Sequence, residues 1–335
     1  MTLKKKERKD FGKDWFLITM NKKAIIFGIK GHSLNKQEKI FFKRNIPWGI
    51  ILFSRNIKNI SQLKILIDDI KRIFRNKNFP VMIDVEGGRV SRLNKIIDLS
   101  IFSQNHFSKL YKKKNKELFF NYYNIYINAI SKILRSVGIN INTVPVLDVS
   151  RKKTHSVIGN RSFSKNPKKV SLLGNLCINY YKKNKIACVV KHIPGHGLAR
   201  SDSHYKTPII RENKKELIKK DFKPFKECKS LLAMTAHVVY EKIDPNNTAT
   251  HSKIIINEII REHIKFKGIL ISDDISMNSL KYSINKNAIK ALKAGCNLVL
   301  HCNGKINEMR KLARVIPTID KFTQKKTSDF YKFIG

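Results

Sequence analysis

The sequence predicts an α/β fold of one domain, a (β/α)8 TIM-type barrel. Eight short apolar runs, rich in β-branched residues, recur along the 335 residues and are separated by segments with helical periodicity. Several of the runs are almost continuously apolar, as is usual for parallel strands that are buried on both faces. No stretch rich in Gly, Ser and Pro divides the chain. Strand–helix alternation repeated eight times within about 300 residues is typical of this barrel.

The strands are expected at the apolar runs, and amphipathic segments are expected to form the helices between them. In chain order the expected strands are Ala24–Ile29, Gly49–Phe53, Pro80–Val85, Asn142–Val149, Ile186–His192, Leu231–Val238, Gly268–Asp273 and Asn297–Cys302.

Two of the helices have clear signals. The segment Lys116–Val137 carries an apolar stripe at i, i+3, i+4 spacing, which predicts a long amphipathic helix. The stripe comprises Leu118, Phe119, Tyr122, Tyr123, Tyr126, Ile130, Ile133, Leu134 and Val137. A second helix is expected to begin at Ser61, whose hydroxyl can serve as its N-cap. Its inner face is expected to comprise Leu63, Leu66, Ile67, Ile70, Ile73 and Phe74.

One catalytic domain is expected over residues 23–316, with a basic segment on either side. Residues 1–22 begin with a run of lysines and are expected to form a poorly ordered extension that leads into the first strand. Lys305–Val315 is the last helical pattern, and residues 317–335 are expected to form a basic tail.

The chain is strongly basic, with a formal net charge of +43 at pH 7. A charge of this size raises the possibility of a nucleic-acid-binding protein. The basic residues, however, are mostly lysines spread along the whole chain, and Asn and Ile are also abundant, as an AT-rich genome would encode. A basic nucleic-acid-binding protein is therefore kept as an alternative, and no specific nucleic-acid partner is expected.

The apolar runs and the cysteines indicate where the protein is expected to act. No apolar run approaches the roughly 18 residues needed to span a bilayer, so no membrane insertion is expected. The five cysteines form an odd set with no CxxC pair, which fits a reducing, cytoplasmic compartment.

Polar residues follow the expected strands at their carboxyl ends, where barrel enzymes carry their active sites. These residues are Arg55, Asp84, Glu86, Asp148, Lys191, His192, His237, Asp273 and Asp274. We therefore expect one rim of the barrel to collect them.

The loop after the fifth strand, KHIPGHGLARSDSHYKTP, concentrates titratable side chains. In an extended segment residues i and i+2 point the same way, so the Asp202 carboxylate can reach the His204 ring. This pairing fixes the tautomer of the histidine and suits a general acid/base. The alternative is a metal-dependent hydrolase with His192, His196, Asp202 and His204 as ligands, although HEXXH and short-spaced cysteine pairs are absent.

Two further segments place carboxylates at the rim. In DVEGGRVSR, Asp84 can accept hydrogen bonds from two sugar hydroxyls, or can instead form a structural ion pair with Arg89 or Arg92. At the end of the seventh strand, Asp273 is expected to face the barrel mouth as a nucleophile, base or ligand. Asp274 is expected to turn aside and cap the segment that follows.

Six motifs together resemble those of the β-N-acetylglucosaminidases of glycoside hydrolase family 3. They are IDVEGGRVSRL, VPVLDV, IGNRSF, KHIPGHG with DSH, MTAHVVY and ILISDDISM. They occur in register from about Gly49 to Asn303, and the match is to the single-domain bacterial type that acts in peptidoglycan recycling.

The resemblance implies a retaining, two-step mechanism. Asp273 would be the nucleophile that forms a covalent glycosyl-enzyme, His204 the acid/base, and Asp202 the residue that orients His204. The residues implied to bind the N-acetylglucosamine are Asp84, Arg92, Arg161, Lys191 and His192. No cofactor or metal is implied.

The substrate implied by the family is N-acetylglucosamine linked to 1,6-anhydro-N-acetylmuramic acid, with or without a peptide. A monomer that acts on a small carbohydrate or muropeptide is therefore expected. A histidine acid/base repels an anionic acceptor less than a carboxylate would, so a phosphorylase on the same site is a further alternative.

Overall fold

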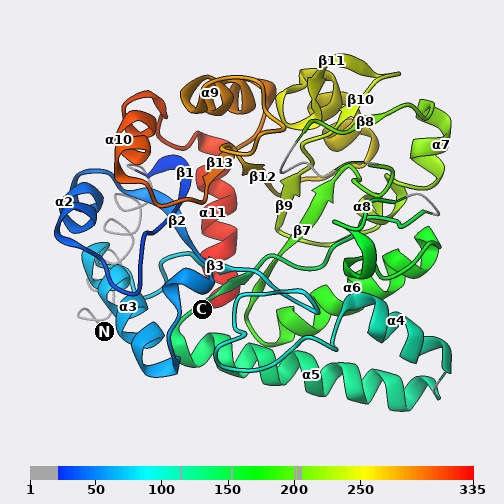
Figure 1. The fold of residues 1–335 in the computed structure, drawn as a ribbon, viewed down its shortest axis with the longest axis horizontal. Coiled ribbons are helices and arrows are strands. Elements are labelled where there is room, and N and C mark those ends of the chain that lie inside the picture. Colours follow the sequence, from blue (N-terminus) through cyan, green and yellow to red (C-terminus); the bar gives the residue numbers. More distant parts are fainter. Residues whose placement is uncertain (1–21, 114, 152–153, 200, 202–205) are drawn as a thin grey trace, which may run out of the picture.

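The structure is a computed structural model that describes residues 22–113, 115–151, 154–199, 201 and 206–335. Within these residues a closed barrel of parallel strands forms the centre of the molecule (Figure 1). Its strands, in order around the barrel, are β1 (Lys23–Gly28), β13 (Leu298–His301), β12 (Ile269–Asp274), β9 (Leu232–Thr235), β7 (Ala187–Ile193), β6 (Ile141–Asn142), β3 (Val81–Ile83) and β2 (Pro47–Leu52). The predicted barrel is confirmed.

Helices cover the outside of this barrel (Figure 1). They are α2 (Lys36–Arg44), α3 (Ile60–Ile73), α4 (Gln104–Lys113), α5 (Lys116–Val137), α6 (Pro167–Lys183), α7 (Lys214–Lys219), α8 (Lys223–Lys226), α9 (Ile284–Ala294), α10 (Ile306–Val315) and α11 (Lys321–Ile334). A π-helical segment, Ile255–His263, stands between β11 and β12. None of the described helices is long and apolar enough to cross a membrane.

Two small sheets lie outside the barrel. Strands β4 (Val85–Gly87) and β5 (Val90–Ser91) form a hairpin, and β8 (Ile209–Ile210), β10 (Val239–Tyr240) and β11 (Asp244–Thr248) form a three-stranded sheet. Both occur in loops that follow the carboxyl ends of barrel strands, so they shape the barrel mouth.

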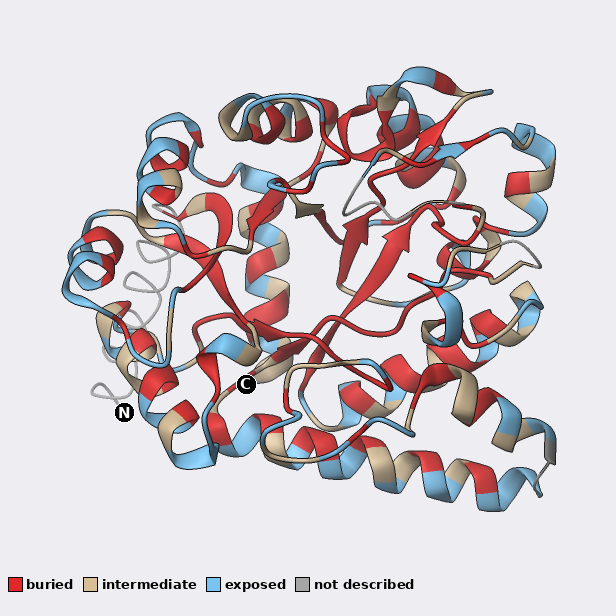
Figure 2. Cartoon of the chain, in the orientation of Figure 1, coloured by how far each residue is buried: buried red, intermediate tan, exposed pale blue. Residues whose placement is uncertain are grey.

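Burial follows the apolar pattern of the sequence (Figure 2). Every residue of β2 and of β7 is buried, as the near-continuous apolar runs predict. The expected strand Asn142–Val149 is regular only over β6. Its later part runs on as buried irregular chain with one bridge, from Val146 to Lys191.

Helix α5 has the bounds that the apolar stripe predicted. The Asn115 side chain caps its first turn by accepting the N–H of Glu117, and Gly138 ends it with a positive φ of 92°. Leu118 and Tyr122, which we assigned to the inner stripe, are exposed instead. They lie on the outer side of the helix because the buried face is narrower than the apolar pattern.

Helix α3 begins earlier than expected. Its N-cap is Asn59, whose Oδ1 accepts the N–H of Gln62 at 2.9 Å, so the assignment of Ser61 as N-cap is wrong. Both side chains have a cap-forming oxygen, and the chain enters the helix two residues before Ser61.

The structure tests only the C-terminal one of the two expected flanking segments. Residues 1–21 lie outside the described part of the chain, but Lys22 is buried. Residues 317–335, expected to be a tail, contain α11, which packs against the amino ends of the strands. Trp48 at the start of β2 donates to Thr327 at 2.8 Å, and the Trp48 and Phe330 rings lie 5.8 Å apart. The apolar residues of α11 are spaced among lysines, and for this reason the sequence predicted a basic tail instead of a packed helix.

Candidate active site

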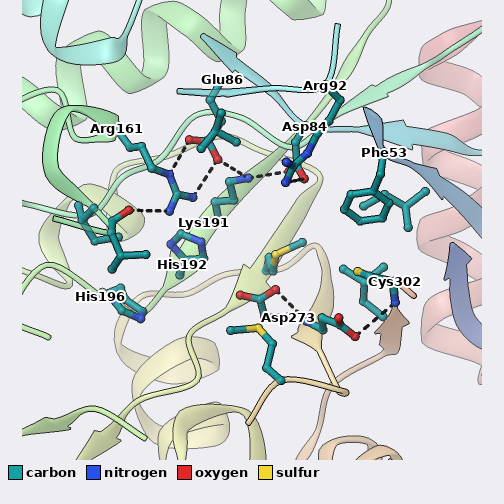
Figure 3. A pocket seen from close by; sticks show the side chains of 18 of the residues that line it. Phe53, Asp84, Glu86, Arg92, Arg161, Lys191, His192, His196, Asp273 and Cys302 are labelled. Carbon is teal, nitrogen blue, oxygen red and sulfur yellow. Dashed lines mark hydrogen bonds and ion pairs between the residues drawn. The ribbon is translucent and has the colours of Figure 1, made fainter. Parts of the chain in front are cut away.

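A pocket of about 200 Å³ opens at the carboxyl ends of the barrel strands (Figure 3). Its charged and histidine lining residues are Asp84, Glu86, Arg89, Arg92, Arg161, Lys191, His192, His196, Asp273 and Asp274. The expected rim is therefore largely formed. Arg55, Asp148 and His237 do not line the pocket, but each contacts or supports a residue that does.

The pocket is locally neutral in a chain that is strongly basic. Its lining contains as many carboxylates (Asp84, Glu86, Asp273, Asp274) as cationic side chains (Arg89, Arg92, Arg161, Lys191). The formal charge of the whole chain is +43. A site with balanced charges and many hydrogen-bonding groups suits a neutral polar ligand better than an anion.

Lys191 joins two carboxylates at one side of the pocket. Its Nζ lies 2.9 Å from Asp84 Oδ1 and 2.6 Å from Glu86 Oε1, and it donates to Thr143 Oγ1 at 3.0 Å. The Thr143 hydroxyl in turn donates to Asp84. An ammonium has three N–H donors, so these protein acceptors already use all of them.

Glu86 also holds Arg161 in a two-pronged ion pair. Arg161 Nε lies 2.7 Å from Glu86 Oε2, and its Nη2 lies 2.9 Å from Oε1. A third N–H, on Nη1, donates to the carbonyl of Val157 at 3.0 Å. Two of the five guanidinium N–H groups therefore remain for a ligand.

These contacts determine which groups are charged. Burial alone raises the pKa of the Asp84 carboxyl, but Lys191 and Arg92 outweigh burial and hold this pKa well below its usual range. The same balance, with Arg161 and Lys191 as the cations, lowers the pKa of Glu86 to about 2. Burial lowers the pKa of Lys191, and Asp84 and Glu86 more than reverse that effect. Both carboxylates and the ammonium are therefore charged at neutral pH.

Arg92 completes this side of the site. Its Nη2 lies 3.2 Å from Asp84 Oδ2, so one of the two ion pairs considered for Asp84 is formed. The other candidate, Arg89, instead donates to the carbonyls of Ser156 and Val157. The Arg92 guanidinium also lies 5.3 Å from the ring centroid of Phe53, which lines the pocket.

Asp148 orients His192 from below the pocket. Its Oδ2 lies 2.7 Å from His192 Nδ1, and its Oδ1 accepts the backbone N–H of His196 at 2.7 Å. Burial raises the pKa of Asp148, but His192 and His196 lower it below its usual value. A carboxylate can only accept, so Nδ1 of His192 must donate and Nε2 is the ring nitrogen left for the pocket.

Asp273 and Asp274 end β12 in different ways. Asp273 lines the pocket, and its Oδ1 accepts the N–H of Asp274 at 2.7 Å. Asp274 also lines the pocket, so the expectation that it turns aside is wrong. It does accept the N–H groups of Ser276 at 3.1 Å and Cys302 at 3.3 Å, and so supports the backbone of the following turn, as expected.

The surroundings of Asp273 favour the ionised carboxylate. Burial raises its pKa, but His237 and His192, the N–H of Asp274 and Lys191 together lower it below the usual range. His237 lies behind the site, where its Nε2 donates to the carbonyl of Asp274 at 3.0 Å.

Asp202 and His204 lie outside the described residues, so the structure does not place the expected acid/base pair. Two members of the alternative metal set, His192 and His196, have ring centroids 5.6 Å apart. In the part of the chain that the structure describes, no group of three His, Cys, Asp or Glu side chains could hold a metal ion.

Sequence reasoning placed Glu86 and Asp148 at the rim but gave them no role. Glu86 is the centre of the ion-pair network, and Asp148 fixes the orientation of His192. The available signal was that each carboxylate directly follows an apolar strand, although only the distances to Arg161 and His192 define what they do.

Comparison with known proteins adds independent findings. The family model described as "Glycosyl hydrolase family 3 N terminal domain" matches residues 22–329. The beta-hexosaminidase of Psychromonas ingrahamii is 31% identical over 315 residues, which are 92% of this chain and 89% of that protein. The beta-hexosaminidase of Idiomarina loihiensis is also 31% identical and covers 88% of both chains.

A solved structure shares the fold. NagZ from Neisseria gonorrhoeae, in complex with N-trifluoroacetyl-D-glucosamine, aligns with a TM-score of 0.83 and 29% sequence identity, over 94% of this chain and 90% of that one. The native form of the same protein aligns with the same TM-score and identity, over 92% and 90%.

Proposed function

The chain belongs to glycoside hydrolase family 3, and from this premise we propose that it removes terminal β-linked N-acetylglucosamine from muropeptides by a retaining mechanism. That it is a glycoside hydrolase of the β-N-acetylglucosaminidase type follows from the family and from the relatives described above. The leaving group, the biological role and the mechanism are the parts that we propose.

The observation that carries the proposal is the ionised Asp273 carboxylate at the end of β12, facing the neutral pocket. A nucleophile must be deprotonated and must have an oxygen free to attack. Asp273 Oδ1 accepts the N–H of Asp274, so we assign the attack to Oδ2. The short link to the backbone holds the carboxylate in one orientation.

In the first step Oδ2 of Asp273 forms a bond to the anomeric carbon while the glycosidic C–O bond breaks. The leaving oxygen takes a proton from His204, which Asp202 orients. In the second step His204 takes a proton from water as the water oxygen attacks the anomeric carbon, and the Asp273 ester bond breaks. The roles of Asp202 and His204 rest on the DSH motif and on the resemblance.

We assign the sugar to the pocket walls formed by Asp84, Arg92, Arg161 and His192. Asp84 can accept from sugar hydroxyls, Arg161 has two uncommitted N–H groups, and His192 presents Nε2. Lys191 acts on the sugar indirectly, in place of the direct contact that the resemblance implied, because Asp84, Glu86 and Thr143 already use its three donors. A neutral sugar fits this balanced set of charges.

The muropeptide leaving group and a role in cytoplasmic peptidoglycan recycling are proposed from the family type. The chain spans about nine-tenths of NagZ from N. gonorrhoeae and of its first curated relative, so no large part of those proteins lacks a counterpart. The odd, unpaired set of five cysteines in the sequence supports a reducing compartment.

The first experiment is release of p-nitrophenol from its β-N-acetylglucosaminide, with wild type and Asp273→Ala side by side in EDTA. We expect wild type alone to turn over, with a loss of at least about 10⁴-fold in the variant. Activity of Asp273→Ala close to wild type would rule out Asp273 as the nucleophile. Loss of wild-type activity in EDTA would instead favour a metal-dependent hydrolase.

A second experiment tests His204. We expect His204→Ala to lose more kcat/KM on N-acetylglucosaminyl-1,6-anhydro-N-acetylmuramic acid than on the p-nitrophenyl glycoside, because p-nitrophenolate needs little protonation to leave in the first step. Equal losses on both substrates would contradict the role of His204 as the acid.

A further inference from the structure

The loop that follows β7 forms one wall of the pocket and is held by hydrogen bonds to the neighbouring loops. His196 lines the pocket, and its N–H donates to Asp148 Oδ1 at 2.7 Å. Thr154 Oγ1 donates to the carbonyl of Gly197 at 2.6 Å, and His155 N–H donates to the carbonyl of Ala199 at 3.1 Å. The wall therefore depends on the segment that follows β6.

The loop leaves no room for a side chain at Gly197 and little room at Gly195. A Cβ on Gly197 would lie 1.9 Å from the carbonyl oxygen of Val149. A Cβ on Gly195, which has a φ of +147°, would lie 3.1 Å from the Cβ of Asp221. Val149 and Asp221 thus border the loop at successive points.

An ion pair connects these two borders. Arg151, two residues after Val149, places Nη2 at 2.7 Å from Asp221 Oδ2. The Asp221 side chain is 3% exposed, and its Oδ1 has no hydrogen-bond partner in the described residues. Asp221 follows the end of α7, where its N–H donates to the carbonyl of Leu217 at 2.9 Å, so its backbone is fixed.

The carboxylate is buried at an energetic cost. Burial raises the pKa of Asp221 to about 6, although Arg151 acts in the opposite direction. A buried carboxylate that has one bonded oxygen among the described residues is not the arrangement that stability alone favours, because an apolar residue of similar size would avoid the desolvation. This points to a role in positioning.

We propose that Arg151 and Asp221 are positioning residues, whose ion pair holds together the two borders of residues 195–197 and so sets the pocket wall that carries His196. The proposal rests on the proposed function, in which the continuation of the same loop supplies the proton to the leaving group. It assigns neither residue a contact with the substrate.

The test compares Asp221→Asn, Arg151→Met and Arg151→Lys with Glu241→Gln as a control. Glu241 forms an exposed ion pair with Arg211, whose Nε lies at 3.5 Å. Glu241 follows Tyr240 of β10, whose hydroxyl donates to the carbonyl of Gly195 in this loop. Each variant is assayed with a phenyl and a 2,4-dinitrophenyl β-N-acetylglucosaminide, which differ in how much protonation the leaving oxygen needs.

We expect kcat/KM for the phenyl substrate to fall about 10–100-fold in Asp221→Asn and Arg151→Met, since a small misplacement of an acid costs this much. We expect kcat/KM for the dinitrophenyl substrate to fall less than about threefold, because kcat/KM reports the first step, in which dinitrophenolate leaves with little protonation. Arg151→Lys should keep most of the activity, and Glu241→Gln should keep all of it. Wild-type kinetics in Asp221→Asn and Arg151→Met, or equal losses on both substrates, would overturn the proposal.

Hydrogen exchange gives a readout that does not depend on turnover. We expect the N–H groups of His196 and Ala199 to exchange at least about tenfold faster in Asp221→Asn and Arg151→Met than in wild type, with no change in Glu241→Gln. Unchanged exchange would overturn the proposal. If wild type cleaves neither glycoside, the proposed function fails while this measurement still decides the role of the pair. Arg151 is part-exposed, so its variants provide the test if Asp221→Asn does not fold.

Discussion

A lysine is buried at each end of the barrel, and only the one at the mouth is paired with carboxylates. At the mouth, Lys191 Nζ lies within 3 Å of two carboxylates, Asp84 and Glu86. At the base, Lys22 Nζ donates to the Tyr331 hydroxyl and lies 5.3 Å from the centroid of the Phe79 ring. In the described part of the chain no carboxylate pairs with Lys22, and burial is the only cause that shifts its pKa.

The pKa values follow this difference. Burial lowers the pKa of both side chains, but at the mouth Asp84 and Glu86 raise that of Lys191 above its usual value. At the base nothing opposes burial, and the pKa of Lys22 falls to about 7. At the mouth, ion pairs keep the side chains charged and available to a polar ligand. At the base, the side chains pack against each other and a charge there lowers the stability of the fold.

Lys191→Met is expected to have the largest effect. The variant leaves Asp84 and Glu86 buried with fewer cations, and breaking such a pair costs about 3–5 kcal/mol of unfolding free energy. We also expect kcat/KM to fall at least about 10²-fold, because Asp84 and Glu86 lose the ammonium that holds both of them. Urea unfolding at pH 7 and p-nitrophenol release measure the two effects.

The acid side of the stability profile gives a further check on Lys191→Met. In wild type the depressed pKa of Glu86 contributes stability that is present above pH 4.5 and is lost as the pH falls through about 2. Without Lys191 this pKa rises, so unfolding in acid should begin at a higher pH. An unchanged acid midpoint would show that Arg161 alone holds Glu86 ionised.

Lys22→Met, the matched change at the base, is expected to have the opposite sign. Replacing this buried amine, whose charge no carboxylate in the described residues balances, with an apolar side chain should raise the unfolding free energy at pH 7 by about 2–4 kcal/mol. Kinetics should stay at the wild-type level, since Lys22 is at the far end of the barrel from the pocket.

The pH dependence of this gain tests its cause. The folded pKa of Lys22, about 7, is below the unfolded value of 10.5, so the unfolded chain binds more protons between these pH values. Wild-type stability from this group therefore rises with pH, and the advantage of Lys22→Met should shrink toward pH 10. A constant advantage would mean that packing, and not the charge, makes the difference.

Asp148→Asn is expected to have the smallest effect of the three. The amide keeps the shape but can turn an N–H toward His192 Nδ1, which favours the wrong tautomer of the ring. We expect kcat/KM to fall about 10–100-fold, equivalent to about 1–3 kcal/mol. Thr327→Val is the control at the base, where it removes the hydrogen bond from Trp48. It should cost about 1 kcal/mol of stability and leave kinetics unchanged.

Local patterns in the sequence predicted much of the fold. The eight apolar runs correspond to the eight barrel strands, and the stripe of Lys116–Val137 corresponds to α5. These features depend on residues close together in the chain, so the spacing of apolar residues is enough to predict them. Helix α11 was missed because its apolar residues are sparse and its stability comes from contacts with Lys22 and Trp48, which are remote in sequence.

For the site as well, local patterns in the sequence predicted which residues lie there. The rule that barrel strands end at the active site was enough to name Asp84, Lys191, His192 and Asp273, which line one pocket. The sequence by itself therefore determined the barrel, the family and the residue types at the mouth, because strand ends and motifs are local.

Only the tertiary structure decided which charges are paired. Asp84 and Lys191 are 107 residues apart, and the pairs Arg161–Glu86 and Arg151–Asp221 are separated by 75 and 70 residues. Such distances depend on how the barrel closes. The effect of burying a charge depends on the groups around it. The opposite pKa shifts of Lys22 and Lys191 could therefore not be predicted from the sequence.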